Sequence, residues 1–167
     1  MPNPCLFCDA ECCKSYTITV TAFDILRAAE ASGKKPEEFA VLHQARLLAF
    51  DPDTTLDMED DGWVHILGIK SHPCAFLGKD DRCTIHQSAP LSCRRYPFQL
   101  NNKLNTRFCP LPSQVVFSLK GPDSSAEQLV HELELHKKIV KEWNKKPGKK
   151  ADCIKFLLKR AQQLSVE

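Results

Sequence analysis

The chain has 167 residues, of which 43% are hydrophobic and 26% charged, the proportions of a globular protein large enough to bury a core. The formal net charge of +2 and the lack of a dense lysine or arginine block argue against nucleic acid as a partner. No apolar run approaches the roughly 20 residues of a membrane span, and the first residues lack the basic and apolar regions of a secretory signal, so we expect a cytoplasmic protein without a membrane partner.

The N-terminal third predicts a strand followed by two helices. The β-branched, alternating stretch Ser15–Val20 predicts the strand. Thr21 with Asp24 three residues later is typical of a helix start, and Gly33 of its end. Pro36 suits the first position of the second helix. The side chains expected on the buried face of that helix are Phe39, Leu42 and Leu47.

The middle of the chain predicts loops and short strands. Residues 51–62 are acidic and rich in turn formers, and they lack the spacing of a calcium-binding loop, so we expect a solvated loop. Residues 63–69 predict a strand. The segment 72–110 is expected to form short strands and turns, with a tight turn at 78–82.

The tail predicts two helices. The first follows Gly121, with Asp123 or Ser124 as its cap, and stops near Pro147. Its apolar face is expected to contain Leu129, Val130, Leu133, Val140 and Trp143. Apolar residues spaced i, i+3, i+4 and i+7 form the face of the second helix, and they are Ile154, Leu157, Leu158, Ala161 and Leu164.

These elements predict an α+β fold with a small strand-and-loop metal core, N-terminal helices and a C-terminal helical hairpin. We expect a cysteine-cluster metal-binding domain at 1–120 and the hairpin at 121–167, packed together as one compact unit.

Cysteine is the most informative residue type, because eight of the nine cysteines fall into two clusters. In a reducing cytoplasm, clustered thiols indicate metal ligation or redox chemistry rather than disulfides. The sequence therefore predicts that sulfur ligands from two distant segments converge on metal. The expected ligands are Cys5, Cys8, Cys12, Cys13, Cys74, Cys83, Cys93 and Cys109.

The metal and the number of ions stay open at this point. Four thiolates suit zinc or iron. Neighbouring side chains of an extended chain point opposite ways, so Cys12 and Cys13 would serve two metals, or one would bind while the other bridges or reacts. The residues fit two four-ligand sites or one polynuclear centre, with six or seven true ligands also compatible. The wide spacing of the second cluster slightly favours an iron–sulfur cluster over zinc.

Other candidate ligands have simpler interpretations. Cys83 and His86 are close enough in sequence to share an ion, but His86 is more often a structural neighbour of such a site. We expect His65 and His72 to be bystanders, and Cys153 to be a small buried apolar side chain.

With these residues in view, the chain resembles the YkgJ-type cysteine-cluster proteins, a family with a zinc- or iron-chelating domain. The resemblance covers roughly residues 4–110. The matching pieces are Cys5-x2-Cys8-x3-Cys12-Cys13, the run from Pro73 to Leu77, the run from Cys83 to Phe98, and Cys109-Pro110. The family usually has arginine where this chain has Ala89, so any role of that arginine is absent here.

The resemblance implies two functions. One is a metal-binding protein whose metal ions are held mainly for structure, so that removing them would unfold residues 1–110. The other is an iron–sulfur enzyme that modifies a protein substrate, since a longer branch of the family resembles flagellin lysine methylases that use S-adenosylmethionine. The chain has no G-x-G-type cofactor loop, so a common methyltransferase fold is not indicated. Arg94, next to Cys93, is the expected cofactor-binding residue, because an arginine there offsets thiolate charge and can hold an anion. The alternative is a structural role in which Arg94 pairs with a carboxylate such as Asp9 or Glu11.

Overall fold

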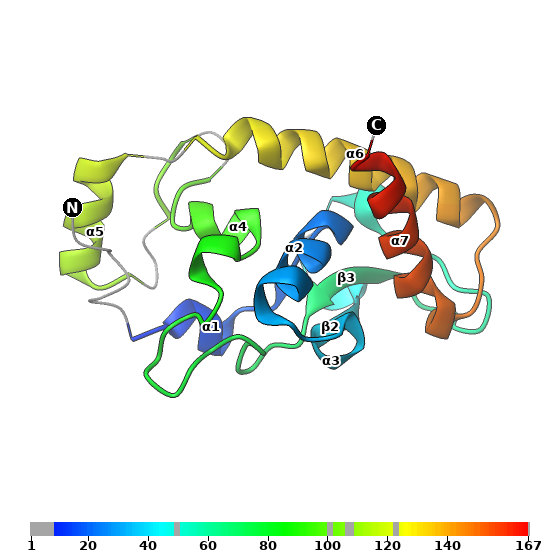
Figure 1. Ribbon diagram of the computed structural model, residues 1–167, viewed down its shortest axis with the longest axis horizontal. Coiled ribbons are helices and arrows are strands. Elements are labelled where there is room, and N and C mark those ends of the chain that lie inside the picture. Colours follow the sequence, from blue (N-terminus) through cyan, green and yellow to red (C-terminus); the bar gives the residue numbers. More distant parts are fainter. Residues whose placement is uncertain (1–8, 49–50, 100–101, 106–108, 122–123, 167) are drawn as a thin grey trace.

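The computed structural model describes residues 9–48, 51–99, 102–105, 109–121 and 124–166. Within these ranges it contains α-helices and one small antiparallel sheet, so the α+β prediction is confirmed (Figure 1). The α-helices are α1 (Glu11–Ser15), α2 (Ala22–Ser32), α3 (Pro36–Phe39), α4 (Leu91–Arg95), α5 (Leu111–Lys120), α6 (Ala126–Lys145) and α7 (Lys150–Leu164). The strands are β1 (Ile18–Thr19), β2 (Ala40–Gln44) and β3 (His65–Ile69), and the short 3₁₀ turns are η2 (Ala45–Leu47), η3 (Pro52–Thr54) and η4 (His86–Ser88).

The sheet has the order β1-β3-β2, with both neighbours antiparallel to β3. All five residues of β3 are buried, as expected for a central strand covered on both faces. Two predicted strands are present in shortened form. The strand predicted at 15–20 pairs only through Ile18 and Thr19, and the strand predicted at 63–69 begins at His65. This register aligns Thr19 with Gly68, which brings the chain leading from α1 against the middle of the sheet.

Helix α2 begins and ends where the sequence predicts. The Thr21 side chain accepts the backbone N–H of Asp24 at 3.2 Å, and the Asp24 carboxylate accepts the N–H of Thr21 at 3.0 Å, which completes a capping box. Gly33 closes the helix with φ of +67°, a left-handed conformation that glycine adopts at no steric cost.

The second predicted helix is wrong beyond its first turn. Pro36 does occupy the first position of α3, but the helix ends at Phe39 and the chain continues directly as β2. The reason is tertiary pairing: residues 40–44 form the full edge of the sheet against β3, and this outweighs the local helical pattern. Phe39 and Leu42 are buried as predicted, whereas the side chain of Leu47 lies outside the described part.

The two tail helices are present as α6 and α7, and α7 packs against both α6 and α2. The N-cap of α6 is Ser125, not Ser124, and its side chain makes no capping hydrogen bond; Asp123 lies outside the described residues. Val130 is 49% exposed, so its predicted place on the buried face is wrong. Residues buried on the two helices include Val140, Trp143, Leu157 and Ala161.

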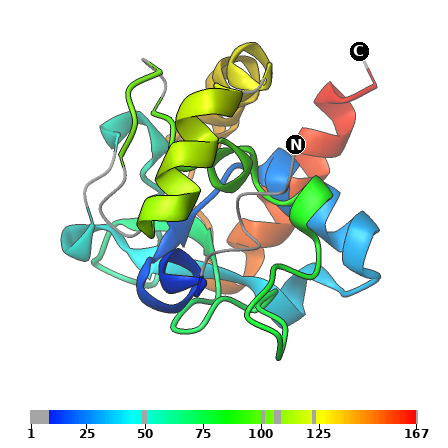
Figure 2. The same cartoon turned by 90° about the vertical axis from the view of Figure 1, so that its left-hand side faces the viewer.

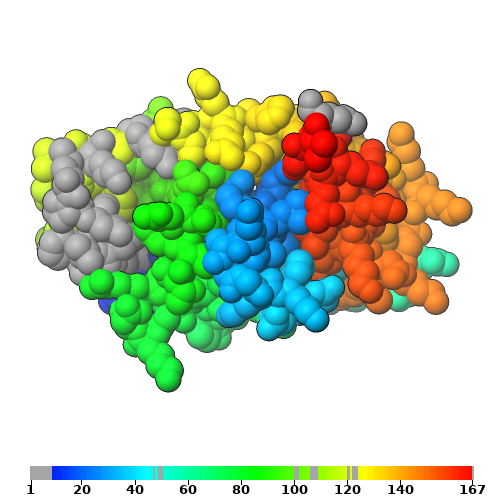
Figure 3. Space-filling view, viewed as in Figure 1, coloured from blue at the N-terminus to red at the C-terminus, as the bar shows by residue number. Residues whose placement is uncertain are grey.

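One apolar cluster joins the two ends of the chain. It contains Ile25 of α2, Leu67 of β3, Val140 of α6 and Leu157 of α7, together with Cys74 from the second cysteine cluster. On the face shown in Figure 3, residues of α2 to β2 lie between the segment 72–99 and α7. The helices α1, α4 and α5 gather toward the opposite end from α7 (Figure 1), and α5 lies nearest the viewer when that end is seen directly (Figure 2). No helix in the described part of the chain has the length and apolarity needed to cross a membrane.

Candidate metal centre

The first cysteine cluster enters the structure on α1. Ala10 starts this helix with φ of +59°, and the turn that follows carries Cys12 and Cys13. Neighbours on a helix are rotated by only about 100°, so both thiols can face the same region, unlike the opposed pair expected for an extended chain. The backbone N–H of Cys74 donates to the carbonyl oxygen of Cys13 at 2.8 Å. The two distant cysteine segments are therefore joined directly.

A hairpin-like turn positions Cys83. The N–H of Gly78 donates to the carbonyl of Arg82 at 2.7 Å, and Leu77 and Cys83 form an antiparallel bridge. This is the tight turn that the sequence predicts at 78–82. An ion pair of 3.0 Å between Lys14 and Asp81 fastens the turn to α1. Cys83 is therefore held next to both Cys74 and α1.

Cys93 lies on α4, a five-residue helix that the sequence did not predict. The Asp24 carboxylate of α2 accepts the backbone N–H of Leu91 at 2.9 Å, which satisfies the first amide of α4. Cys109 stands just before α5, where the Gln114 side chain donates to its carbonyl oxygen at 2.6 Å. Helix α5 was also not predicted, although Pro112 in its first turn and Gly121 at its end are signals of a helix start and stop.

These segments line one cavity of about 320 Å³ that is partly open to solvent. All six cysteines of the two clusters that the structure describes line this cavity, and they are Cys12, Cys13, Cys74, Cys83, Cys93 and Cys109. Cys5 and Cys8, the other two predicted ligands, lie outside the described residues. No three Cys, His, Asp or Glu side chains of the described part already form a group that could hold a metal ion. The thiols thus share a cavity without meeting at a single point.

Proton affinities differ sharply along the cavity wall. A hydrogen bond between neighbouring thiols lowers the pKa of Cys12 to about 7, and the same bond raises the pKa of Cys13. Burial raises the pKa of Cys74, Cys83 and Cys93. Most of these sulfurs therefore carry protons at neutral pH, and a metal that binds them would displace those protons.

The other predicted candidates divide into two groups. His86 lines the cavity, whereas Arg94 is not among the residues that line it. His65 lies at the start of β3, with its Nε2 atom 2.9 Å from Lys150 Nζ, and His72 contacts the Thr17 hydroxyl at 3.1 Å. Neither His65 nor His72 lines the cavity, which agrees with their expected role as bystanders. Cys153 is fully buried in the apolar cluster, as predicted, and burial raises its pKa to about 12.

Sequence reasoning missed part of the cavity wall. Tyr16 and Tyr96 both line it, with ring centroids 6.0 Å apart in an edge-to-face contact. Burial and the neighbouring Cys109 raise the pKa of Tyr96. Ser113 and Phe117 complete one side from α5. Tyr96 was not among the missed residues, because the sequence predicts that Tyr96, Pro97 and Phe98 pack against the metal site; Tyr16, Ser113 and Phe117 were missed, the last two because helix α5 was not foreseen.

Comparison with known proteins agrees with the cysteine pattern. No curated protein matches the chain, and no solved structure matches it either. A family model named after its CxxCxxCC pattern and described as a "putative zinc- or iron-chelating domain" matches residues 4–110, which include both cysteine clusters. The chain belongs to this zinc- or iron-chelating family.

Proposed function

We propose that this protein binds a zinc- or iron-containing centre through thiolates of both cysteine clusters. One observation carries the proposal: six cysteines from four separate segments line a single cavity. The hydrogen bond from Cys74 to the Cys13 carbonyl supports it, because it holds the two clusters in contact. Free thiols on this scale suit a reducing compartment, so we propose a cytoplasmic location.

The donor set fits a thiolate-bound metal. Cysteine sulfur is the preferred ligand of zinc and of iron–sulfur clusters. The six described thiols would hold the centre, and Cys5 and Cys8 would complete the ligand set proposed from the sequence. When bound, such a centre would either cross-link the segments that carry the cysteines or accept and donate electrons. The chain itself contributes the converging segments and the hydrogen-bonded Cys12–Cys13 pair.

The size of the cavity favours a polynuclear centre. One water molecule occupies roughly 30 Å³ in the liquid. A cavity of about 320 Å³ has room for several atoms. This supports an iron–sulfur cluster over a single zinc ion.

The decisive experiment is to purify the protein without oxygen and to count iron, sulfide and zinc per chain. We expect iron and acid-labile sulfide together with broad visible absorption. Cys83→Ser and Cys93→Ser should each lower the metal content, whereas the matched control Cys153→Ala should keep it, because Cys153 is buried away from the cavity. A colourless protein with bound zinc would select zinc. Metal-free protein from every purification would reject the proposal.

An iron–sulfur enzyme that modifies a protein substrate is the second candidate. It is favoured by the hydroxyl-bearing wall of the cavity, where Tyr16, Tyr96 and Ser113 line the same space as the thiols. In this proposal S-adenosylmethionine is the co-substrate and Arg94 a cofactor-binding residue. Equilibrium dialysis of the metal-loaded protein against labelled S-adenosylmethionine tests it. Saturable binding that Arg94→Gln weakens would support the enzymatic function. An absence of binding would reject the enzymatic function and would not affect the proposed metal binding.

A further inference from the structure

The Tyr96 hydroxyl is a buried polar group that the fold leaves without a partner. Tyr96 follows α4, and its backbone N–H donates to the carbonyl oxygens of Ser92 and Cys93 at 3.1 and 3.2 Å, which closes that helix. Its side chain lines the cavity of the six cysteines, which we call the cysteine cavity. The Oη atom is buried, and no group of the described residues lies in hydrogen-bonding geometry with it. A buried hydroxyl without a hydrogen bond costs free energy, so this one requires an explanation.

Aromatic contacts hold the Tyr96 ring in this place. The ring meets the edge of Tyr16, with centroids 6.0 Å apart and an interplanar angle of 78°. Two residues further on, Phe98 makes a similar contact with Phe117 of α5, with centroids 6.2 Å apart. These contacts fasten the segment 96–98 to the chain before β1 on one side and to α5 on the other. The hydroxyl is therefore presented to the cavity wall by packed rings.

Cys109 is the sulfur that neighbours this hydroxyl. It stands directly before α5, is 9% exposed and lines the same cavity. Burial is the largest cause that raises the pKa of Tyr96, and the charge of a Cys109 thiolate is the next, so the two groups lie close together. The hydroxyl of Tyr16 is a further polar neighbour, but it is neutral. A thiol is a weak hydrogen-bond acceptor, whereas a metal-bound cysteine is a thiolate, and a charged acceptor binds a donor more strongly.

We propose that the Tyr96 hydroxyl donates a hydrogen bond to the Cys109 sulfur when the cysteine cavity holds its metal centre, and thereby strengthens metal binding. This inference rests on the proposed function. Tyr96 would be a positioning residue and not a ligand, because its donor would orient the Cys109 thiolate and offset part of the charge. The hydroxyl would thus gain the acceptor that the thiol does not provide, since metal binding displaces the thiol proton. Groups that hydrogen-bond to metal ligands typically change metal affinity by about 10–100-fold.

The test compares the wild type with Tyr96→Phe, which removes the hydroxyl and keeps the ring that packs on Tyr16. Each full chain is purified without oxygen, and EDTA is titrated against the metal that it holds. We expect Tyr96→Phe to lose half of its metal at an EDTA concentration about tenfold lower than the wild type requires. After complete removal of metal, urea unfolding should show the variant to be no less stable than the wild type, because the variant lacks only an unpaired hydroxyl.

Ser71→Ala is the matched control, since Ser71 also has a buried hydroxyl without a partner but does not line the cysteine cavity. It should release metal at the EDTA concentration of the wild type. Equal metal retention in Tyr96→Phe and wild type would overturn the role of Tyr96 while the proposed function stands. A loss of stability in the stripped Tyr96→Phe chain would assign the hydroxyl a structural role and would also overturn the inference. A wild-type protein that holds no metal would overturn the proposed function and this inference with it.

Discussion

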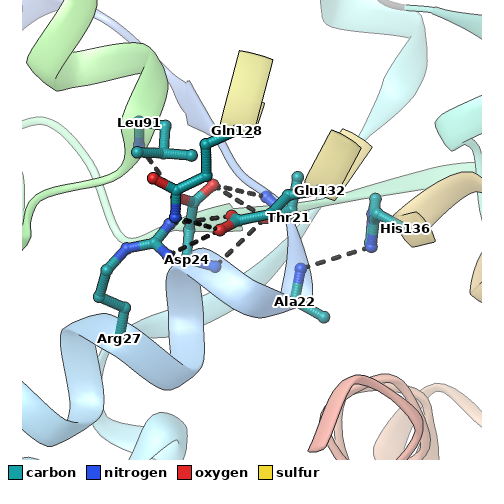
Figure 4. Close-up of polar contacts among 8 residues, drawn as sticks. All are labelled: Thr21, Ala22, Asp24, Arg27, Leu91, Gln128, Glu132 and His136. Carbon is teal, nitrogen blue, oxygen red and sulfur yellow. Dashed lines mark hydrogen bonds and ion pairs between the residues drawn. The ribbon is translucent and has the colours of Figure 1, made fainter. Parts of the chain in front are cut away.

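The Asp24 carboxylate on α2 accepts the backbone N–H of Leu91 at 2.9 Å, although 67 residues separate them. Leu91 opens α4, the helix that carries Cys93. Arg27 donates to Asp24 at 2.6 Å and to Glu132 of α6 at 2.9 and 3.0 Å, so the same network reaches the tail (Figure 4). A residue that the sequence identifies only as part of a helix cap thus also fixes one wall of the cysteine cavity.

Replacing Asp24 by asparagine should destabilise the fold by about 3 kcal/mol, the lower end of what breaking a buried ion pair costs. The variant keeps the size of the side chain, but it removes the charge that Arg27 and two backbone N–H groups share. Arg27 retains Glu132 as a partner, which limits the loss. Urea unfolding with an unchanged m-value measures the effect.

The matched control is Thr21→Ala, which removes the reciprocal cap but leaves the contact between Asp24 and Leu91 intact. Loss of a cap alone costs about 1 kcal/mol. If Asp24→Asn cost no more than Thr21→Ala, the negative charge of Asp24 would contribute nothing to stability beyond the cap.

His136 should make stability depend on pH. Burial lowers its pKa from 6.5 to about 4 in the folded chain. Between pH 4 and pH 6.5 the unfolded chain binds a proton at His136 that the folded chain does not bind. The free energy of unfolding therefore falls as the pH falls from 6.5 toward 4, and above pH 6.5 the contribution of His136 to stability is fully present. The total effect is about 3 kcal/mol. Unfolding of the wild type and of His136→Gln across this range isolates it, because other groups cancel in the difference. Parallel curves would contradict this.

Gly33 and Gly62 form a matched pair, since an added Cβ meets nothing within 4 Å at either position. They differ in backbone: Gly33 has φ of +67°, which an L-residue adopts at a cost of roughly 1–2 kcal/mol. Gly33→Ala should therefore lower stability by about 1 kcal/mol, and Gly62→Ala should have no cost. Thermal unfolding compares the two. Equal midpoints would refute the role of the left-handed conformation at the end of α2.

Gly68 should tolerate no side chain. A Cβ at this position would lie 2.5 Å from a His43 ring carbon and 2.7 Å from the backbone oxygen of Ile18. The ring can move, but the oxygen belongs to the neighbouring strand β1. We expect Gly68→Ala to cost about 3 kcal/mol, the upper range for overpacking, or to prevent folding. Circular dichroism and urea unfolding would show this, and wild-type stability would mean that β1 can move away freely.

Local signals predicted much of the scaffold. Thr21, Asp24 and Gly33 mark both ends of α2, because capping depends on residues a few positions apart. The turn at 78–82 was predictable for the same reason. The sequence also predicted that sulfurs of the two cysteine clusters converge, since soft ligands at such spacing have few other uses in a reducing compartment, and the six described cysteines of these clusters line one cavity. Which of these sulfurs bind metal stays a prediction.

Features that depend on distant partners were not predictable. The chain after Phe39 forms a strand only because β3 lies beside it, and a local helical pattern cannot reveal that. Val130 fits the apolar period of α6 yet is exposed, because buried polar residues, Glu132 and His136, take the inner face of that helix. A cavity of about 310 Å³, lined by Leu129, Leu133 and His136 of α6, follows from the same packing and left no pattern in the sequence.

Removal of metal should loosen one end of the molecule more than the other. The sequence predicts unfolding of residues 1–110, but the apolar cluster shows that α2 and β3 pack against α6 and α7 through contacts that do not involve metal. We therefore expect a chelator to abolish the protection of amides in α1 and α4 from hydrogen exchange, while amides of α2 and α7 stay protected. Cys153→Ala should show the same pattern as the wild type. Uniform loss of protection would mean that the centre holds the whole fold together, and unchanged protection of α4 would mean that metal does not organise the cavity.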